Sequence, residues 1–374
     1  MVLAVITHVE HKPVGGNIYA AYGPYVKEMN LWFKYVDSVV IVAPEKKSAP
    51  DKIDLNYTIA TSLIPVKEIN LTTASGRLSA LVIAPITFLN IIEACKTADH
   101  IHLRCPGNIG LLGCIAQIFF PSKKKTAKYA GNWDKNSGQP WSYRLQRWIL
   151  NNEFLTRNMQ VMVYGEWPDS SRNVTPFFTA SYSDNFKLPV SPRDIHAQPI
   201  RLIFVGALIQ NKRPLLSIEI AEELTALGIK VQLDIFGNGP LYSDLDKYIN
   251  GRNLGNFVTL HGNQPADVVM EAFRQSHFLI FLSKSEGWPK VVAESMWWGC
   301  LPVTTAVSCV PQMLGNETRG SLIEANSAKA VAAIKLYMDN PNLYYEKVTT
   351  AMNWSRNYTI EKFEAAIRLL LKNE

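Results

Sequence analysis

The chain has 374 residues, of which 47% are hydrophobic and 19% charged. This composition is typical of a folded protein and excludes disordered and fibrous classes, while the length predicts two or three domains of roughly 150 residues. Residues 1–198 contain 21 Lys and Arg against 15 Asp and Glu, which leaves 38 − 21 = 17 against 32 − 15 = 17 for the remainder. The whole net charge of +6 therefore lies in the N-terminal half, where it suits an anionic ligand or an acidic membrane surface; no nucleic-acid-binding module accompanies it.

Short β-branched runs alternate with longer amphipathic segments along the chain, which is the pattern of parallel sheets with crossover helices. In the first half the predicted strands are 2–7, 38–42, 100–104, 126–129 and 160–164. In the second half they are 201–205, 231–236, 257–261, 278–282 and 301–304. We therefore predict an α/β protein with two Rossmann-like domains, 1–185 and 199–355.

The two domains are joined by a predicted linker at 181–198, a polar stretch that contains Pro189 and Pro192. The segment 359–372 repeats apolar residues at helical spacing, namely Ile360, Phe363, Ile367 and Leu370. We assign 356–374 to a closing helix and expect it to pack back toward the N-terminal domain. Open α/β sheets bind ligands outside the carboxyl ends of their strands, so we expect the active site in a cleft between the two domains.

The longest apolar stretches, 78–92 and 109–120, are shorter than the ~20 residues that span a bilayer, and we predict no transmembrane helix. The N-terminus reads as a buried strand without a basic leader, so no signal peptide is expected. The five cysteines have neither disulfide-framework nor zinc-site spacing. A cytoplasmic location is the resulting expectation.

The strongest local signal follows the predicted strand 278–282, where residues 283–296 read SKSEGWPKVVAESM. A glycine turn and a proline near the first helical position predict that a helix starts there, and its unpaired amide groups can hold a phosphate or sugar hydroxyls. Glu286 lies in the loop and Glu294 near the second helical turn, so the two carboxylates can flank one ligand. Helix capping by Glu286 and simple solvent exposure of Glu294 are the alternative roles.

This segment resembles the E-x7-E signature of retaining glycosyltransferases of family 4, which have the two-domain GT-B fold. The resemblance extends over the C-terminal half through ordered landmarks, namely Phe204-Val205-Gly206 followed by Lys212, then Phe236-Gly237-Asn238-Gly239-Pro240, His261-Gly262 and the glutamate pair. The N-terminal half agrees more loosely, through a first strand followed by Gly15-Gly16 and then a helix. The resemblance implies a GT-B fold for the whole chain.

The resemblance also implies roles for individual residues. Glu286 and Lys212 would be catalytic, with Glu286 on the donor sugar and Lys212 on the diphosphate, where a fixed cation stabilises the departing phosphate. Glu294 would bind the nucleotide ribose. The remaining donor-binding positions would be Gly15, Gly16, Gly206, Arg213, Gly287, Trp288, Pro289, Lys290 and Val291.

Two positions depart from the family pattern. The family often has Arg directly after the glycine of its Val-Gly pair, whereas this chain has Ala207, so a diphosphate cation is missing from its usual place and Arg213 is the available substitute. Lys290 stands where the family commonly has Asn. Two roles are open for Lys290, supplying the missing charge or pointing to solvent.

Acceptor residues are expected in the N-terminal domain. Asn132 and Asp134 follow the predicted strand 126–129, where they either orient an acceptor hydroxyl or cap a turn. His102 is a third acceptor candidate; it shares one face of a strand with His100, and a structural role is open for both. Gly15 and Gly16 either approach the ligand closely or form a plain turn.

Two further segments have a composition that suits membrane contact or metal binding. Residues 118–125 join apolar residues to three lysines, and we expect this segment either to make peripheral contact with the inner membrane leaflet or to form a solvated helix end. Asp244 and Asp246 imitate a D-x-D metal motif but fall in a predicted helix away from any strand end, so we expect no metal site and no cofactor beyond the nucleotide-sugar substrate.

The predicted function is a retaining glycosyltransferase that is independent of metal and moves a sugar from a nucleotide diphosphate sugar to a hydroxyl of a glycan or lipid-linked glycan in cell-surface polysaccharide biosynthesis. Two alternatives are open: an epimerase that converts the nucleotide sugar without an acceptor, and a catalytically silent subunit that binds the nucleotide sugar. The silent subunit is motivated by Ala207 and Lys290.

Overall fold

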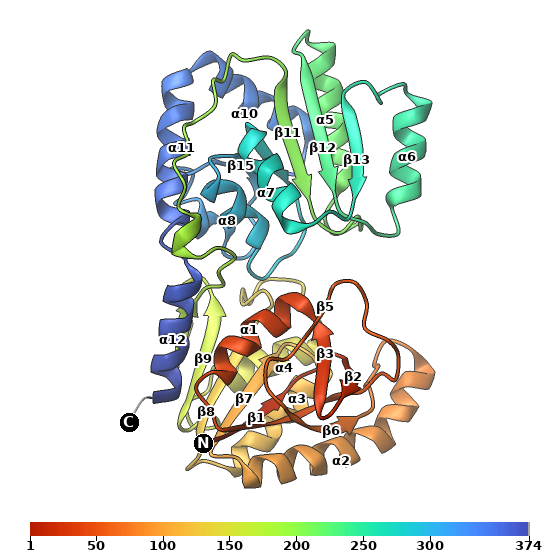
Figure 1. Cartoon of the computed structure of the whole chain (residues 1–374), viewed down its shortest axis with the longest axis vertical. Helices are drawn as coiled ribbons and strands as arrows, with labels where there is room; N and C mark the ends of the chain where they lie inside the picture. Colours follow the sequence, from red (N-terminus) through yellow and green to blue (C-terminus); the bar gives the residue numbers. More distant parts are fainter. Residues whose placement is uncertain (373–374) are drawn as a thin grey trace. The chain divides into compact units, whose positions relative to one another are not determined.

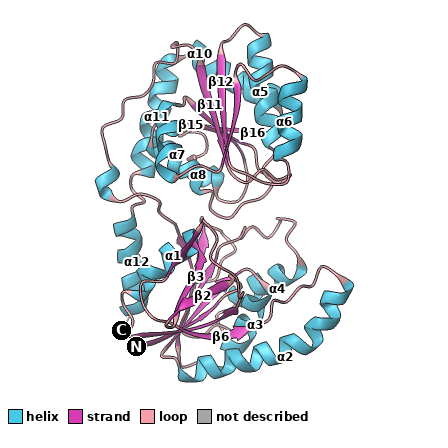
Figure 2. Cartoon of the chain, turned by 45° about the vertical axis from the view of Figure 1, so that its right-hand side comes forward, coloured by secondary structure: helices cyan, strands magenta, loops and turns pink. Residues whose placement is uncertain are grey.

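The computed structural model describes residues 1–372, which form two compact units (Figure 1). The first unit contains Met1–Phe178 and the end of the chain from Lys362, and the second unit contains Thr179–Glu361. Each unit is built on its own parallel sheet, with helices on both faces of that sheet (Figures 1 and 2). The predicted α/β class with two Rossmann-like domains is confirmed.

The first unit has a seven-stranded parallel sheet in the order β10-β9-β8-β7-β1-β4-β6. Its strands, in chain order, are β1 (Val2–Ile6), β4 (Ser38–Pro44), β6 (Ser62–Val66), β7 (His100–Cys105), β8 (Lys124–Tyr129), β9 (Met159–Tyr164) and β10 (Val174–Phe177). A small antiparallel sheet of β2 (His11–Gly15), β3 (Ile18–Tyr22) and β5 (Asp54–Asn56) adjoins it. The helices are α1 (Gly23–Phe33), α2 (Ala74–Thr97), α3 (Asn108–Ala116), α4 (Trp141–Leu150) and α12 (Ile360–Lys372).

Alternation along β7 shows which helices cover which face of this sheet. His102 stacks on Trp32 of α1 and Arg104 pairs with Glu28 of α1, whereas Ile101 and the other alternate residues belong to the apolar core shared with α2, α3 and α4. Successive strand residues point to opposite faces, so α1 and the group α2–α4 lie on opposite sides.

The second unit has a six-stranded parallel sheet in the order β13-β12-β11-β14-β15-β16. Its strands are β11 (Ile200–Val205), β12 (Val231–Phe236), β13 (Val258–Gly262), β14 (Phe278–Phe281), β15 (Leu301–Thr305) and β16 (Ser321–Ile323). Its helices are α5 (Pro214–Ala226), α6 (Tyr242–Gly251), α7 (Ala266–Gln275), α8 (Lys290–Trp297), α9 (Val310–Met313), α10 (Ser327–Asp339) and α11 (Pro341–Ser355).

All ten predicted strands are present within one or two residues of their expected ends. The sequence patterns missed β2, β3, β5, β6, β10 and β16, which are short, lie at sheet edges or carry proline and polar residues. The predicted linker belongs to the second unit, because the Arg193 guanidinium donates hydrogen bonds to the carbonyl oxygens of Gly299 (2.8 Å) and Trp298 (2.9 Å).

The closing helix α12 packs on the first unit. The Phe363 ring contacts the rings of Phe177 and Phe178, with centroids 5.4 and 5.7 Å away, and lies 4.9 Å from Lys128 Nζ. The Glu364 carboxylate accepts hydrogen bonds from Lys34 Nζ (3.0 Å) and the Tyr35 hydroxyl (2.8 Å). Aromatic packing therefore joins the C-terminal helix to β10, with charged contacts at its side.

Helix α2 is longer than the apolar run on which the exclusion of a membrane-spanning helix was based. It has 24 residues because it continues past the apolar run 78–92 at both ends. By length and composition alone it could cross a membrane, and it is the one helix of residues 1–372 that passes this test. One side of α2 packs in the core of the first unit through residues such as Ala80, Ile91 and Cys95.

Candidate functional site

The order of strands in the second unit marks its ligand site. From the central strand β11 the chain passes to β12 on one side, and β14 later pairs with β11 on the other side. The carboxyl ends of β11 and β14 thus flank the point where the direction of winding changes, and open α/β sheets bind ligands at this point. The loops that follow these strands, 206–213 and 282–289, lie side by side there.

These two loops bring the predicted catalytic residues together. The Lys212 ammonium lies 2.5 Å from a carboxylate oxygen of Glu286, and both side chains are half-buried. Lys212 Nζ also lies 5.2 Å from the centroid of the Phe281 ring at the end of β14. The site therefore presents a cation and an anion, 74 residues apart in sequence, at the edge where a ligand is expected.

Arg213 is fixed differently from Lys212. Its backbone is left-handed, with φ of 50°, and its guanidinium donates a hydrogen bond to the Leu282 carbonyl (3.1 Å) at the end of β14. The side chain is half-buried beside the Lys212–Glu286 pair. Arg213 thus adds positive charge to the same edge of the sheet.

Hydrogen bonds to backbone groups of the Glu286 loop hold this loop from both sides. Asn211 accepts from the Lys284 amide (2.8 Å) and donates through its side chain to the Ser285 carbonyl (2.9 Å). From the opposite side, the Thr305 hydroxyl donates to the Ser283 carbonyl (2.7 Å) and the Ser308 hydroxyl to the Gly287 carbonyl (3.0 Å). The loop is therefore preformed, which is the arrangement that electrostatic catalysis requires.

Tight backbone packing explains two of the glycines in the sequence landmarks. Gly237 has φ of 130°, and an added Cβ would overlap the carbonyl oxygen of Gly206. A Cβ on Gly239 would lie 2.6 Å from the carbonyl oxygen of Leu208. The loop after β12 thus supports the loop after β11 by direct backbone contact, while the surroundings of Gly206 itself are open, with no atom closer than 3.9 Å to an added Cβ.

Glu294 occupies a separate environment on α8. Its carboxylate accepts a hydrogen bond from the Ser181 hydroxyl (2.5 Å). Burial raises the pKa of Glu294, and the Ser181 hydrogen bond and the Lys290 charge oppose that rise. Glu294 lines a small pocket together with Trp288, Lys290 and Tyr358. The Lys290 charge thus influences Glu294, the proposed ribose-binding residue. The two glutamates therefore have different partners, because Glu286 pairs with Lys212.

The start of α8 carries the remaining donor-binding candidates. Pro289 directly precedes the first helical residue, Lys290, and makes no side-chain cap, so the first-turn amides, including that of Val291, are not capped by a side chain. The Gly287 carbonyl is occupied by Ser308, and the Trp288 ring packs against Trp354 and Tyr358 with centroids 6.4 and 5.8 Å away.

In the first unit, Gly15 and Gly16 form part of the turn between β2 and β3. The pairing of Gly15 with Ile18 leaves Gly16 and Asn17 as the two turn residues, with φ of 56° and 60°. A hairpin with a two-residue turn of this kind needs positive φ at both positions, which glycine adopts without strain. The two strands β2 and β3 therefore separate the first strand from the first helix, a feature that the expected strand–glycine–helix order lacked.

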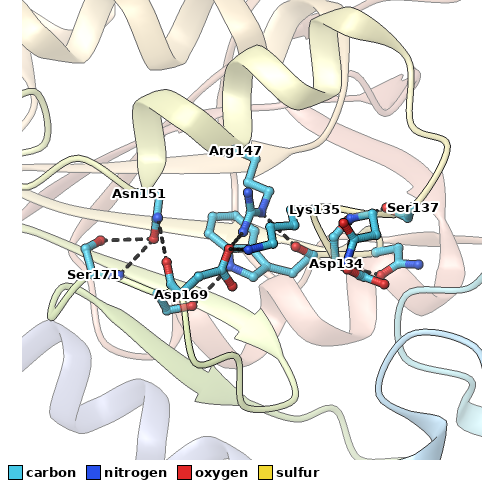
Figure 3. A network of polar contacts seen from close by, with 11 residues as sticks. Asp134, Lys135, Ser137, Arg147, Asn151, Asp169 and Ser171 are labelled. Carbon is cyan, nitrogen blue, oxygen red and sulfur yellow. Dashed lines mark hydrogen bonds and ion pairs between the residues drawn. The ribbon is translucent and has the colours of Figure 1, made fainter.

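Asn132 and Asp134 lie in the loop after β8 and both cap that loop. Asn132 accepts from the Asp134 amide (3.0 Å), and Asp134 accepts from the Asn136 amide (2.9 Å). Beside them Arg147 donates to the Trp133 carbonyl (2.7 Å) and pairs with Asp169 at 2.6 Å, as Figure 3 shows. A cavity of about 90 Å³ opens here, lined by Tyr129, Asn132, Asp134, Lys135, Gln139, Tyr143, Arg144 and Arg147.

The His102 ring lies in the interior, which corrects its assignment as an acceptor residue. The side chain is fully buried, hydrogen-bonded to the Thr126 hydroxyl (2.8 Å) and packed against the Trp32 ring in a tilted arrangement with centroids 4.3 Å apart. Its position on the α1 face of the sheet, rather than at a strand end, puts it out of reach of a ligand. His8, in contrast, is exposed in the loop after β1. Its position directly after a strand end is the sequence signal that marks it as a candidate ligand-contacting histidine.

Within residues 1–372, no group of three or more His, Cys, Asp or Glu side chains is arranged to hold a metal ion. Asp244 and Asp246, the residues of the D-x-D imitation, lie on α6, which connects β12 to the edge strand β13, whereas Lys212 and Glu286 follow β11 and β14.

Comparisons with known proteins agree with this architecture. The Anabaena protein HepE, solved in complex with UDP, superposes with a TM-score of 0.70 at 13% identity, covering 100% of this chain and 99% of HepE. WaaG, a glycosyltransferase involved in lipopolysaccharide biosynthesis, gives a TM-score of 0.64 at 14% identity, covering both chains completely. These similarities define the class of fold, and the chain has the two-domain GT-B fold.

The comparison with family models covers most of the second unit. Residues 192–357 match the family model of glycosyl transferases group 1. The predicted assignment to family 4 within that group stays a prediction.

Curated relatives match mainly one part of the chain. The phosphatidylinositol N-acetylglucosaminyltransferase GPI3 subunit of Saccharomyces cerevisiae is 24% identical over 188 residues, which are 47% of this chain and 41% of that protein. The amylovoran biosynthesis glycosyltransferase AmsK of Erwinia amylovora is 27% identical over 175 residues, which are 45% of this chain and 42% of AmsK. The matches thus span about two fifths of the length of these relatives.

Proposed function

We propose that the protein is a retaining glycosyltransferase that moves a sugar from a nucleotide diphosphate sugar to a hydroxyl of a glycan or lipid-linked glycan. The observation that carries the proposal is the Lys212–Glu286 pair on two interlocked loops at the winding change of the second sheet. The group 1 domain that contains this pair supports it. A role in cell-surface polysaccharide biosynthesis is part of the proposal, in keeping with the name of AmsK.

The ion pair suggests how the site would work. A diphosphate that enters next to Lys212 competes with Glu286 for the ammonium group, because both are anionic. Once Lys212 turns to the diphosphate, the Glu286 carboxylate is free to accept hydrogen bonds from sugar hydroxyls. Lys212 then stabilises the negative charge that develops as the diphosphate departs, while the preformed loop fixes the orientation of the sugar.

Other residues would complete the donor site. Glu294 would accept hydrogen bonds from the ribose hydroxyls. Backbone groups of Gly206 and of residues 287–291 would face the diphosphate and sugar, with Arg213 as the second cation. Gly15 and Gly16 are two further proposed donor-binding residues. UDP is the first nucleotide to test, since HepE was solved with UDP and with UDP-glucose.

The acceptor would bind in the first unit, at the cavity beside Asn132 and Asp134. Lys135, Arg144 and Arg147 give that cavity a basic lining, which suits an acceptor with a phosphate or other acidic group. A cytoplasmic location belongs to the same proposal, and it is supported by the five cysteines, all of them free thiols buried in the fold.

The proposal is tested by nucleotide binding and turnover in matched variants. We expect one nucleotide diphosphate from a panel of UDP, GDP, ADP and CMP compounds to raise the melting temperature, since ligand at 100 times its Kd adds about 2.7 kcal/mol to stability. Lys212→Met should reduce kcat/KM by about 100- to 1,000-fold, which is the usual effect of removing one group that stabilises developing charge.

Lys284→Met is the matched control, because Lys284 is an exposed lysine in the neighbouring loop 282–289, and the contact that it makes with Asn211 is through its backbone. Equal turnover of the Lys212 and Lys284 variants would contradict the proposed role. If the wild-type protein converts the nucleotide sugar without an acceptor as fast as it transfers sugar when an acceptor is present, the epimerase is favoured instead. Donor binding with neither transfer nor slow donor hydrolysis would favour the silent subunit.

A further inference from the structure

Helix α2 presents an apolar stripe on its outer side. Leu78, Leu81, Val82, Ile86 and Leu89 are between 57% and 72% exposed. Their spacing places them on one face over about three turns, and no charged residue occurs between Arg77 and Glu93. A helix that covers a sheet in water normally carries charged residues on its outer side, so this stripe has the composition of a buried surface.

The apolar surface continues beyond α2. The Phe119 ring, 66% exposed, packs edge-on against Phe88 of α2 with centroids 6.3 Å apart. On α4, Trp141 and Trp148 are 58% and 60% exposed, and Phe154 beyond the end of α4 is 72% exposed. Because α3 packs against both α2 and α4, these residues share one side of the first unit (Figures 1 and 2). We call this surface the α2–α4 face.

Basic groups lie beside the apolar side chains on this face. Lys123 Nζ donates to the carbonyl oxygens of Lys96 (2.6 Å) and Ala98 (2.5 Å), so the lysine run 123–125 adjoins the C-terminal end of α2. The Arg157 guanidinium lies 4.7 Å from the centroid of the Phe154 ring. Apolar side chains bordered by tryptophan and by lysine or arginine are the arrangement found where proteins meet the headgroup region of a membrane.

We propose that the α2–α4 face docks on a bilayer that contains anionic lipids. The inner side of α2 is packed in the core through Ile91, Ala94 and Cys95, so the helix would lie along the membrane surface with its outer stripe among the acyl chains. The exposed Lys124 and Arg157 would contact the headgroups, whereas Lys125 is buried and bonded to Gln117. The choice of a membrane over a protein partner rests on charge: the stripe itself is uncharged, and the basic groups at its end are complementary to an anionic leaflet.

This surface lies in the first unit and uses none of the residues proposed for donor binding, so the proposal stands apart from the transferase activity. The test is flotation of the full chain with vesicles of phosphatidylcholine alone or mixed with phosphatidylglycerol. We expect flotation with the mixed vesicles, and a loss of binding as salt is raised, because salt screens the lysine contacts.

A double variant, Leu81→Gln with Ile86→Gln, tests the stripe. Both side chains are mostly exposed, so the fold should persist, while binding to the mixed vesicles should weaken about tenfold or more. The matched control is Leu336→Gln with Leu369→Gln, two leucines that are 49% and 63% exposed on α10 and α12, and it should bind as the wild type does. Circular dichroism and the melting temperature verify the fold of both variants.

Three results would overturn the proposal. The first is a wild-type chain that does not float with either kind of vesicle. The second is a stripe variant that floats as well as the control variant. The third is a wild-type chain that forms a dimer in sedimentation, with the stripe variant monomeric and vesicle binding unchanged, since the face would then join two copies of the chain.

Discussion

The two Rossmann-like units place their principal charged clusters at different depths. In the second unit Lys212 and Glu286 form a half-buried pair on loops at the carboxyl edge of the sheet. In the first unit Glu28 of α1 is buried with Arg104 of β7 and Lys128 of β8, and the Lys128 ammonium lies 3.0 Å from the Glu28 carboxylate. The loop pair can exchange partners with a ligand, whereas the buried cluster has no room to do so.

The difference teaches which charges in such a fold serve a ligand. Arg104 and Lys128 hold the pKa of Glu28 far below its usual range despite burial, and the rings of Tyr164, Phe177 and Phe363 surround the Lys128 ammonium at 4.9–5.6 Å. That cluster ties α1, the sheet and α12 together. The basic excess of the N-terminal half is therefore partly structural, and only the exposed remainder is available to an acceptor or a membrane.

The largest expected difference between the two units is their loss of stability in acid. Burial lowers the pKa of His11 and His100 to about 4 and that of His102 well below its usual value, whereas in the second unit His277 is the histidine lowered to about 4. The unfolded chain binds protons at these sites below about pH 6.5 and the folded chain does not, so stability falls as the pH decreases toward 4. At pH 5 each histidine whose pKa is about 4 costs about 2 kcal/mol of stability, so His11 and His100 together cost the first unit about 4 kcal/mol and His277 costs the second unit about 2 kcal/mol. His102 adds to the loss in the first unit.

Hydrogen exchange at pH 7.5 and pH 5, followed peptide by peptide, measures this difference. The first unit should lose protection at pH 5 before the second unit does. His11→Gln, a neutral replacement, should reduce the acid sensitivity of the first unit. Equal loss of protection in both units would contradict the assignment of these buried histidines.

The second largest effect is expected from the buried cluster. Glu28→Gln leaves Arg104 and Lys128 without their counter-charge in the interior, and breaking a buried pair of this kind costs about 3–5 kcal/mol. Urea unfolding measures the loss. Glu93→Gln is the control, since that carboxylate is 66% exposed in an ion pair of 3.6 Å with Lys96 and should cost less than about 0.5 kcal/mol. Equal effects would show that the cluster is not sealed from water.

The smallest effect compares one glycine from each unit. Gly237→Ala forces a Cβ into the Gly206 carbonyl at φ of 130°, so we expect a loss of about 2–3 kcal/mol and weaker nucleotide binding through the displaced loop. Gly16→Ala meets no atom within 4 Å and carries only the strain of its left-handed backbone, about 1 kcal/mol. Thermal unfolding with and without nucleotide tests both. A Gly16 variant as unstable as the Gly237 variant would contradict the open surroundings of that turn.

Much of the fold could be predicted from sequence because its principal strands are buried on both faces. Strands such as β7 and β14 are continuous runs of buried residues bounded by polar turns, and their positions were predicted within two residues. The antiparallel sheet of β2, β3 and β5 was missed because β2 contains Lys12, Pro13 and Gly15 and is stabilised by pairing rather than by an apolar pattern. The 24-residue length of α2 was missed because polar residues extend the helix past its apolar run.

The candidate donor site was predicted more completely than the acceptor site. The glutamate spacing, the glycines and Lys212 carry signals that are local in sequence or ordered along it, and the structure brings Lys212 and Glu286 into contact. The acceptor candidates had only the general rule that strand ends bind ligands. His102 satisfied an alternation pattern but is buried beneath α1, because alternation fixes which face of the sheet a residue is on and not whether a helix covers that face.

The sequence by itself determined the two α/β units, the positions of their main strands along the chain and the residues of the glutamate motif. These features depend on hydrophobic periodicity and turn residues, which act over short distances along the chain. Only the tertiary structure decided that Lys212 pairs with Glu286, that Glu28 is sealed between Arg104 and Lys128, and that the outer stripe of α2 is left uncovered. These features depend on which strands are neighbours and which helix faces are covered, and both are set by packing between segments far apart in sequence.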